Sequence, residues 1–200
     1  MDALPDALDI GWRLLEGGAV DRRSPVHTPV VASVDADGAP DSRVMVLRAV
    51  DRIAGTLRFH TDARSPKCAA LDGRRVSVLA YHPGEAVQLR LAGMARVVAE
   101  GADVDAAWAA ATVFARRCYL AEAAPGSLLT AAGSGLPAWA ERRKPEETDL
   151  VAARRNFALV IVQLTGVDWL HLAEGGHRRA RFSVGDGWLG EWMVQLGQGE

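Results

Sequence analysis

The sequence predicts a mainly β protein, an antiparallel β-barrel with peripheral helices, and three observations support this fold class. From His27 onward, short valine-rich runs alternate with turn-forming residues, which is typical of strands and hairpins. Asp37-Gly38 lies between two such runs, and both residues tolerate the positive φ of a tight turn. A barrel is the economical arrangement for so many strands, because closure removes exposed sheet edges.

Five strands are expected before residue 100, at residues 28–34, 42–50, 55–61, 75–82 and 86–98. Pro83-Gly84-Glu85 separates the last two and makes them an antiparallel pair, and Gly93 is a plausible bulge in the longer one. Strand character returns at residues 157–172. A last hairpin joins residues 180–184 to 186–194 across Gly185-Asp186-Gly187.

Helices are expected on either side of these strands. Leu4 to Glu16 has apolar residues at helical spacing and should end at Gly17-Gly18. Ala102 to Leu120 is alanine-rich and predicts a second helix. Ala131 to Arg154 mixes glycine, proline and dense charge, so we expect a loop with a surface helix there.

The composition indicates one domain that binds a small molecule. A chain of 200 residues, 49% of them hydrophobic, buries one substantial core, so residues 1–200 are expected to form a single domain. A net charge of -2 provides no general positive field for nucleic acid or an anionic membrane. An acidic N-terminus and the lack of a membrane-length apolar run predict a cytoplasmic protein. Cys68 and Cys118 lack CxxC spacing and are expected to stay reduced.

Several kinds of site are disfavoured. The five histidines lack metal-ligand spacing, so no metal is expected, and no serine lies in a nucleophile elbow. The phosphate-binding glycine motifs of nucleotide enzymes are missing from the sequence. Arg178, Arg179 and Arg181, with Trp169 and Trp188, raise the alternative of RNA binding. That alternative is disfavoured because the chain is slightly acidic and has no known nucleic-acid motif.

The segment Phe59 to Lys67 carries the strongest signal for chemistry. A strand ends near Thr61, and Ser65 can then cap a helix in which Pro66 takes the first position. A helix start presents unpaired N–H groups, and Lys67 adds a full positive charge, which suits a phosphate group. The alternative is an exposed lysine on a surface helix.

Polar residues on two other strands extend this signal. Arg43 begins the run SRVMVLR, and Gln88 lies within the alternating run VQLRL. An arginine can bind phosphate bidentately, and an amide can both donate to and accept from a ring edge. Strand alternation divides the first run into two faces, Arg43, Met45 and Leu47 on one and Val44, Val46 and Arg48 on the other.

The order SRVMVLR, FHTDARSPK and VQLRLAGMARVV resembles the pyridoxamine 5'-phosphate oxidase-like superfamily. There, an R-x-V-L-L-K strand is followed by F-Y-T-N-x-x-S-x-K and then by a Q-V-R-x-x-G strand. The resemblance covers Pro29 to Val98. It implies an antiparallel split β-barrel of Greek-key type that forms a homodimer with FMN at the interface.

The resemblance also implies a set of flavin contacts. Arg43 and Lys67 would contact the phosphate, and His60, Thr61, Ser65 and Gln88 would complete the pocket. In the C-terminal part, Trp169 and Arg181 are similar to flavin contacts of the family, and Arg116 or Arg117 would reach the flavin from the partner subunit. The residues beside the isoalloxazine would be Val44, Met45, Val46 and Leu47, with Arg48 in place of the family lysine.

The chain departs from true oxidases at several positions. His60 stands for a tyrosine, and Pro66 replaces a second basic residue. Where the oxidases carry R-L-H-D-R for the substrate phosphate, this chain reads His177-Arg178-Arg179-Ala180-Arg181, in which only the last arginine corresponds. Flavin binding is therefore better supported than oxidation of pyridoxamine 5'-phosphate.

The sequence thus predicts an FMN-binding oxidoreductase that transfers hydride through the flavin to or from a small-molecule substrate. No side-chain nucleophile or other catalytic residue is indicated. Two alternatives stay open. One is a non-catalytic flavin or haem carrier or sensor, in which His171 or His177 would supply an axial haem ligand. The other is a deazaflavin-dependent reductase on the same barrel.

Overall fold

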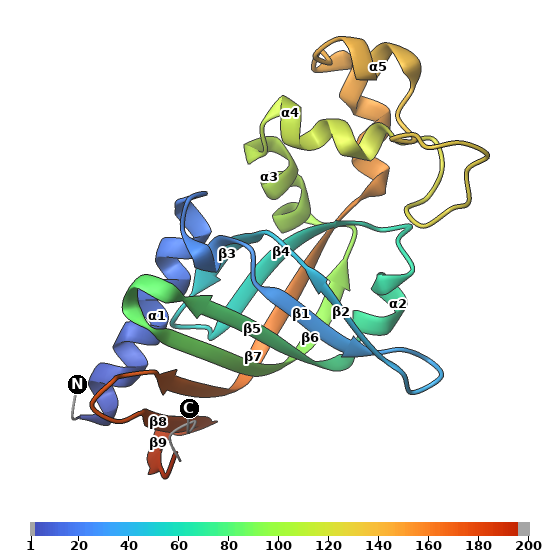
Figure 1. The fold of residues 1–200 in the computed structure, drawn as a ribbon. Coiled ribbons are helices and arrows are strands. Elements are labelled where there is room, and N and C mark those ends of the chain that lie inside the picture. Colours follow the sequence, from blue (N-terminus) through green and yellow to red (C-terminus); the bar gives the residue numbers. More distant parts are fainter. Residues whose placement is uncertain (1–2, 196–200) are drawn as a thin grey trace.

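The structure, a computed structural model, describes residues 3–195 and places nine strands in one antiparallel sheet (Figure 1). Their order is β2-β1-β5-β6-β7-β4-β3, and β8 and β9 extend the sheet from β7. The strands are β1 (Val30–Val34), β2 (Pro40–Val44), β3 (Leu47–Asp51), β4 (Thr56–Asp62), β5 (Arg74–His82), β6 (Val87–Val98), β7 (Phe157–His171), β8 (Arg178–Gly185) and β9 (Gly187–Met193).

Two residues connect the opposite ends of this sheet. β2 and β3 lie at the two ends of the strand order, yet only Met45 and Val46 separate them in the chain. The sheet must therefore curl until its ends meet, although β2 and β3 do not pair with each other. The antiparallel split barrel is confirmed. The single strand predicted at 42–50 was wrong, because β2 pairs with β1 while Leu47 pairs with Phe59 of β4.

A bulge in β6 adjusts the long pairing with β7. The register shifts between Ala92 and Gly93, where the sequence predicted a bulge. A Cβ at Gly93 would lie 2.5 Å from the carbonyl oxygen of Gln163 and 2.7 Å from Cγ1 of Val162. Only glycine allows this close approach of the two backbones.

The N-terminal helix α1 (Leu4–Val20) packs Trp12 and Leu15 into the barrel core. It does not end at Gly17-Gly18, as the sequence predicted. Gly18 lies against the short 3-10 turn η1 (Pro25–His27), since a Cβ there would be 2.9 Å from the carbonyl carbon of Val26. The glycine therefore serves close packing rather than termination of the helix.

The expected helix at 102–120 is broken. It forms α3 (Ala102–Ala110), α4 (Val113–Arg116) and the 3-10 turn η3 (Arg117–Leu120). Ala111 is extended, and Thr112 restarts the helix because its Oγ1 accepts a hydrogen bond from the Ala115 N–H at 3.2 Å. The remaining helical segments are α2 (Lys67–Leu71), η2 (Pro83–Glu85), α5 (Ala138–Arg142) and η4 (Thr148–Asn156).

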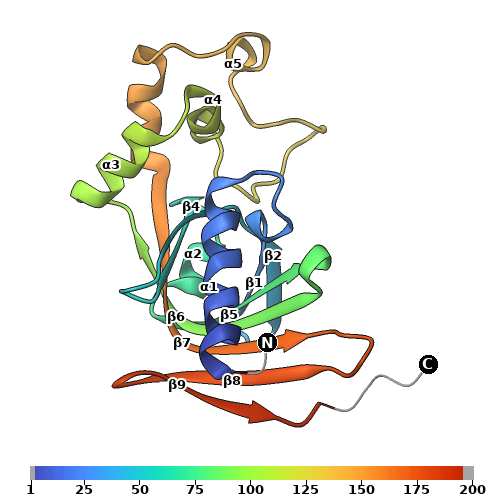
Figure 2. The same cartoon turned by 90° about the vertical axis from the view of Figure 1, so that its left-hand side faces the viewer.

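These helices form a layer at one end of the barrel. In both views α3, α4 and α5 stand beyond one end of the sheet, and the β8–β9 hairpin lies at the other (Figures 1 and 2). A second small core fixes this layer to β7, and Phe157 contacts Trp108 and Tyr119 within it. In the described part of the chain, no helix is long and apolar enough to span a membrane.

The close approach at Gly93 makes a testable prediction. Gly93→Ala should lower the free energy of unfolding by about 1–3 kcal/mol, because the added methyl group overlaps the β7 backbone. Gly17→Ala is the matched control, since nothing lies within 4 Å of a Cβ there. It should raise stability by about 0.5–1 kcal/mol through helix propensity. Urea unfolding measures both, and equal stability of the two variants would contradict the packing described.

Candidate functional site

A cavity of about 230 Å³ lies over the two-residue connection between β2 and β3, and we call it the crossing cavity. Its floor is the backbone and side chains of Val44, Met45 and Val46, which belong to the end of β2 and the connection itself. Its lining contains no acidic residue among those the structure describes. The full lining is Val44, Met45, Val46, Arg48, His60, Lys67, Ala111, Ala115, Cys118, Tyr119 and Phe157.

Strand alternation and a bulge aim the polar residues into this cavity. In β4, Phe59 and Thr61 are buried in the barrel, so Arg58 and His60 face the opposite way. In β3 the register shifts between Leu47 and Ala49, which leaves Arg48 as the extra residue of a bulge. The bulge turns Arg48 toward His60, and both line the crossing cavity.

His60 is neutral at physiological pH. Its pKa is lowered to about 4, mainly by burial and in addition by the nearby positive charges of Arg48 and Arg58. The ring packs edge-on against Phe157, with centroids 4.8 Å apart. Its Nε2 atom is buried and has no hydrogen-bond partner within the described chain. The site therefore offers a neutral imidazole nitrogen with a free hydrogen-bonding position.

Lys67 brings the positive charge that the sequence predicted. It is the first residue of α2 and lines the crossing cavity. Its Nζ donates a hydrogen bond to Ser65 Oγ at 3.2 Å. The sequence predicted that the side chain of Ser65 would cap this helix, but it does not. Instead, its backbone carbonyl accepts from the Cys68 N–H at 2.9 Å, and Pro66 takes the N-cap position.

Two further cavities adjoin the crossing cavity. One, of about 380 Å³, is lined by Arg117 and shares Val46, Arg48, Ala115 and Cys118 with it. The other, of about 200 Å³, shares Arg48, His60, Ala111 and Ala115 with it. We call this third one the arginine cavity, and its lining is Arg22, Arg48, Arg58, His60, Ala107, Ala110, Ala111, Thr112 and Ala115.

Of the two candidate arginines, Arg117, the first residue of η3, lines a cavity, whereas Arg116, the last residue of α4, lines none of those described. Arg116 is buried, forms an ion pair with Glu147 at 2.6 Å and lies over the ring of Trp108. Arg117 donates to the Ala140 carbonyl at 3.4 Å and lies beside Phe114. The sequence left open which of the two arginines faces the site, and in the structure only Arg117 lines one of the cavities described.

Arg43 is not brought to Lys67. Its guanidinium donates to the Val31 carbonyl at 3.1 Å and to Ser33 Oγ at 2.9 Å, and it forms an ion pair with Asp41. It lines none of the cavities described above. Leu47 and Thr61 face the barrel core instead of the crossing cavity. Their contact with a ligand through side chains is therefore not supported by this geometry.

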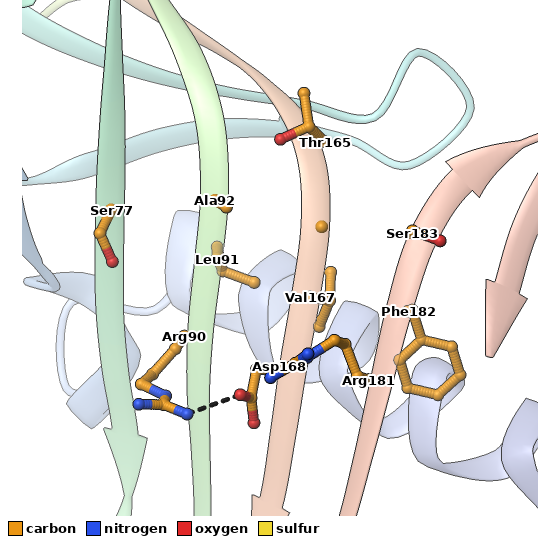
Figure 3. A pocket seen from close by; sticks show the side chains of 11 residues that line it. Ser77, Arg90, Leu91, Ala92, Thr165, Val167, Asp168, Arg181, Phe182 and Ser183 are labelled. Carbon is orange, nitrogen blue, oxygen red and sulfur yellow. Dashed lines mark hydrogen bonds and ion pairs between the residues drawn. The ribbon is translucent and has the colours of Figure 1, made fainter. Parts of the chain in front are cut away.

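Gln88 and Arg181 lie on a different surface, the outward face of β5 to β8, which we call the outer sheet face. Cross-strand pairing aligns Tyr81, Gln88, Leu170 and Arg179 in one row and Leu79, Arg90, Asp168 and Arg181 in the next. Asp168 bonds both Arg90 and Arg179, each at 2.6 Å. Arg90, Asp168 and Arg181 line a hollow of about 420 Å³. Figure 3 shows their side chains, with a helix behind the strands.

Trp169 leaves the sheet on the opposite face from Arg181. It pairs with Ala180, is fully buried, and contacts the ring of Trp192 edge-on at 6.3 Å. One ligand on the outer sheet face cannot contact both residues. His171 and His177 line none of the described cavities, although the Nδ1 atom of each is buried without a partner among the described residues.

The helical wall of the crossing cavity is held firmly in place. Arg64 donates to the Ala121 carbonyl at 3.0 Å and pairs with Asp62 at 2.7 Å. Asn156 donates to the Tyr119 carbonyl at 2.8 Å. Burial raises the pKa of the Cys118 thiol and of the Tyr119 hydroxyl, so both groups present neutral surfaces to the cavity. The wall therefore adds shape rather than charge.

Sequence reasoning missed several of these lining residues. Arg58 had a usable signal, because it stands two residues before His60 in one strand and must share its face. Arg22 follows α1 in an irregular connection, and only the tertiary fold brings it to β3 and β4. Ala115 and Cys118 became wall residues through the helix break at Thr112, which the alanine-rich pattern concealed.

Comparisons with known proteins agree with the sequence resemblance. The family model described as pyridoxamine 5'-phosphate oxidase, FMN-binding domain, matches residues 12–99, which confirms the predicted resemblance over that segment. These residues include the floor of the crossing cavity, together with His60, Lys67 and Gln88. Among curated proteins, none matches this chain.

Solved structures show the same fold. A pyridoxamine 5'-phosphate oxidase-related, FMN-binding protein of Nostoc punctiforme PCC 73102 has a TM-score of 0.73 and 22% identity, covering 98% of this chain and 100% of that one. PhzG of Burkholderia lata 383, in complex with tetrahydrophenazine-1-carboxylic acid, has a TM-score of 0.70 and 20% identity, covering 96% and 92%. The chain therefore has the same fold as these two proteins.

The lowered pKa of His60 predicts a pH dependence of stability. Because the folded state resists protonating His60 between about pH 4 and its ordinary pKa of 6.5, stability should fall as the pH drops through that range. His60→Gln should remove this part of the dependence, up to about 3 kcal/mol between pH 7 and 4. Urea unfolding of both proteins measures it. Parallel pH profiles would show that His60 titrates normally.

Proposed function

We propose that this chain, whose residues 12–99 match an FMN-binding domain, is an FMN-dependent oxidoreductase that acts on a small molecule as a homodimer. The observation that supports it most is the crossing cavity, which combines Lys67, Arg48 and an unpartnered His60 nitrogen without any acidic lining residue. Such a lining suits an anionic cofactor that also needs hydrogen bonds.

The residues present fit FMN in chemical terms. Lys67 Nζ and Ser65 Oγ, already 3.2 Å apart, would hold the phosphate. Val44, Met45 and Val46 would lie along the isoalloxazine, and Val46 pairs with no residue in either neighbouring ladder. Arg43 would have to leave its bonds to Val31 and Ser33 to reach the same phosphate, so its role rests on the family resemblance alone.

Bound FMN would supply hydride transfer, while the protein supplies position and polarity. His60 stays neutral, so its Nε2 atom offers one hydrogen bond to a ring or substrate atom without adding charge. Phe157 and Tyr119 exclude water from the cavity wall. The activity would thus depend on orientation by these side chains, with no nucleophilic residue.

The positions of Gln88 and Arg181 support the proposed homodimer. Both are on the outer sheet face, away from the crossing cavity of their own chain. This face also leaves Leu79, Tyr81 and Met94 exposed by 39%, 45% and 37%. A second copy packed here would cover those apolar side chains and bring Gln88 to its partner's flavin.

The cofactor proposal is tested by titrating purified protein with FMN and following flavin fluorescence. Lys67→Ala should weaken binding by about 2 kcal/mol through loss of a charge-assisted phosphate contact. Lys144→Ala is the matched control, because Lys144 is the only other lysine, is exposed and lines none of the described cavities. It should bind FMN like the unchanged protein.

Parallel titrations with haem and with a deazaflavin separate the two alternative cofactors. The proposal is rejected if FMN does not bind, if haem or the deazaflavin binds in its place, or if the two lysine variants bind FMN equally well.

A further inference from the structure

Three arginines that line the arginine cavity differ from the ten arginines that have a carboxylate within ion-pair distance in the described part of the chain. The ten paired arginines are Arg13, Arg23, Arg43, Arg52, Arg64, Arg90, Arg116, Arg143, Arg154 and Arg179. Arg22, Arg48 and Arg58 have no such partner among the described residues, and all three line the arginine cavity. Three uncompensated guanidinium groups therefore converge on one space.

The same cavity gathers polar atoms that lack partners. Seven buried side-chain nitrogen or oxygen atoms have no hydrogen-bond partner in the described chain, and three of them belong to this lining: Arg48 Nε, Arg58 Nε and His60 Nε2. A buried donor without a partner is unfavourable unless a ligand or solvent atom accepts its hydrogen bond. Their concentration here indicates a place where an acceptor binds.

The rest of the lining leaves room for such an acceptor. The helical wall consists of small side chains around the break between α3 and α4, four alanines and Thr112, so no large side chain fills the space of about 200 Å³. Arg58 also borders a separate cavity that contains Asp51 and Asp103, but it forms an ion pair with neither. Its charge is therefore available to the arginine cavity.

We propose that the arginine cavity binds the anionic group, a carboxylate or a phosphate, of the small-molecule substrate, with Arg22, Arg48 and Arg58 as its donors. This assignment rests on the proposed function for the identity of the substrate, though not for the binding of an anion. Planar guanidinium groups suit both oxyanions because they donate paired, charge-assisted hydrogen bonds.

The arginine cavity and the flavin phosphate site are different places. Lys67 lines the crossing cavity and not the arginine cavity. Arg22 and Arg58 line the arginine cavity and not the crossing cavity. Arg48 and His60 line both, so an anion held by Arg22 and Arg58 places the rest of its molecule beside the crossing cavity. The arginines would thus orient the substrate toward the flavin.

The test is isothermal titration of flavin-free protein with inorganic phosphate and, separately, with benzoate, at constant ionic strength. At least one anion should bind, and the one that binds more tightly identifies the group. Arg22→Gln and Arg58→Gln should each weaken that binding by roughly tenfold or more through loss of a charge-assisted bond. Arg142→Gln removes an equal charge from an exposed residue outside these cavities and should change nothing.

A Lys67→Gln variant separates the two anion sites, because it should retain the binding that the arginine variants lose. The proposal is overturned if neither anion binds, if the arginine variants behave like Arg142→Gln, or if only Lys67→Gln abolishes binding. FMN affinity of Arg22→Gln and Arg58→Gln should match the unchanged protein, and an equal loss of FMN would assign both arginines to the flavin site. Failure of FMN binding with intact anion binding would reject the flavin proposal alone.

Discussion

The two-residue connection between β2 and β3 is the constraint on which the rest of this structure depends. Met45 and Val46 must join strands at opposite ends of the sheet, so the sheet curls into a barrel. The covalent connection closes this barrel, because β2 and β3 form no hydrogen-bonded ladder with each other. Strands that meet without pairing leave their backbone and outward side chains accessible. The crossing cavity forms there, and the α3–α4 break supplies its opposite wall.

Strand alternation then decides what each surface contains. Arg48, Arg58 and His60 reach the cavities because Leu47, Phe59 and Thr61 fill the barrel. In β6 and β8, the residues that the family resemblance associates with the flavin face outward, away from their own chain's cavity. A complete flavin site therefore requires a second chain in our account, whereas the anion subsite is built within one chain.

The sequence predicted the barrel and much of the cavity, because both depend on local patterns. The helix-start signal pointed to Lys67, and the family resemblance named Val44 to Val46, Arg48 and His60; the structure brings these residues together. The break at Met45 was missed because valine-rich residues continue on both sides of it, and the pattern does not show which strand each half pairs with. Arg22 could not be predicted, since an irregular connection has no periodicity that fixes its direction. Trp169 was placed at the flavin, but its pairing with Ala180 buries it in the core.

The central claim is that flavin binds over the β2–β3 connection and between two chains. A crystal structure of the protein grown with FMN tests it most directly. Our account predicts the isoalloxazine along Val44 to Val46, the phosphate at Lys67 Nζ, and Gln88 from a second chain near the ring. Flavin bound at another surface, or fully enclosed by a single chain with Gln88 remote from it, would contradict the account.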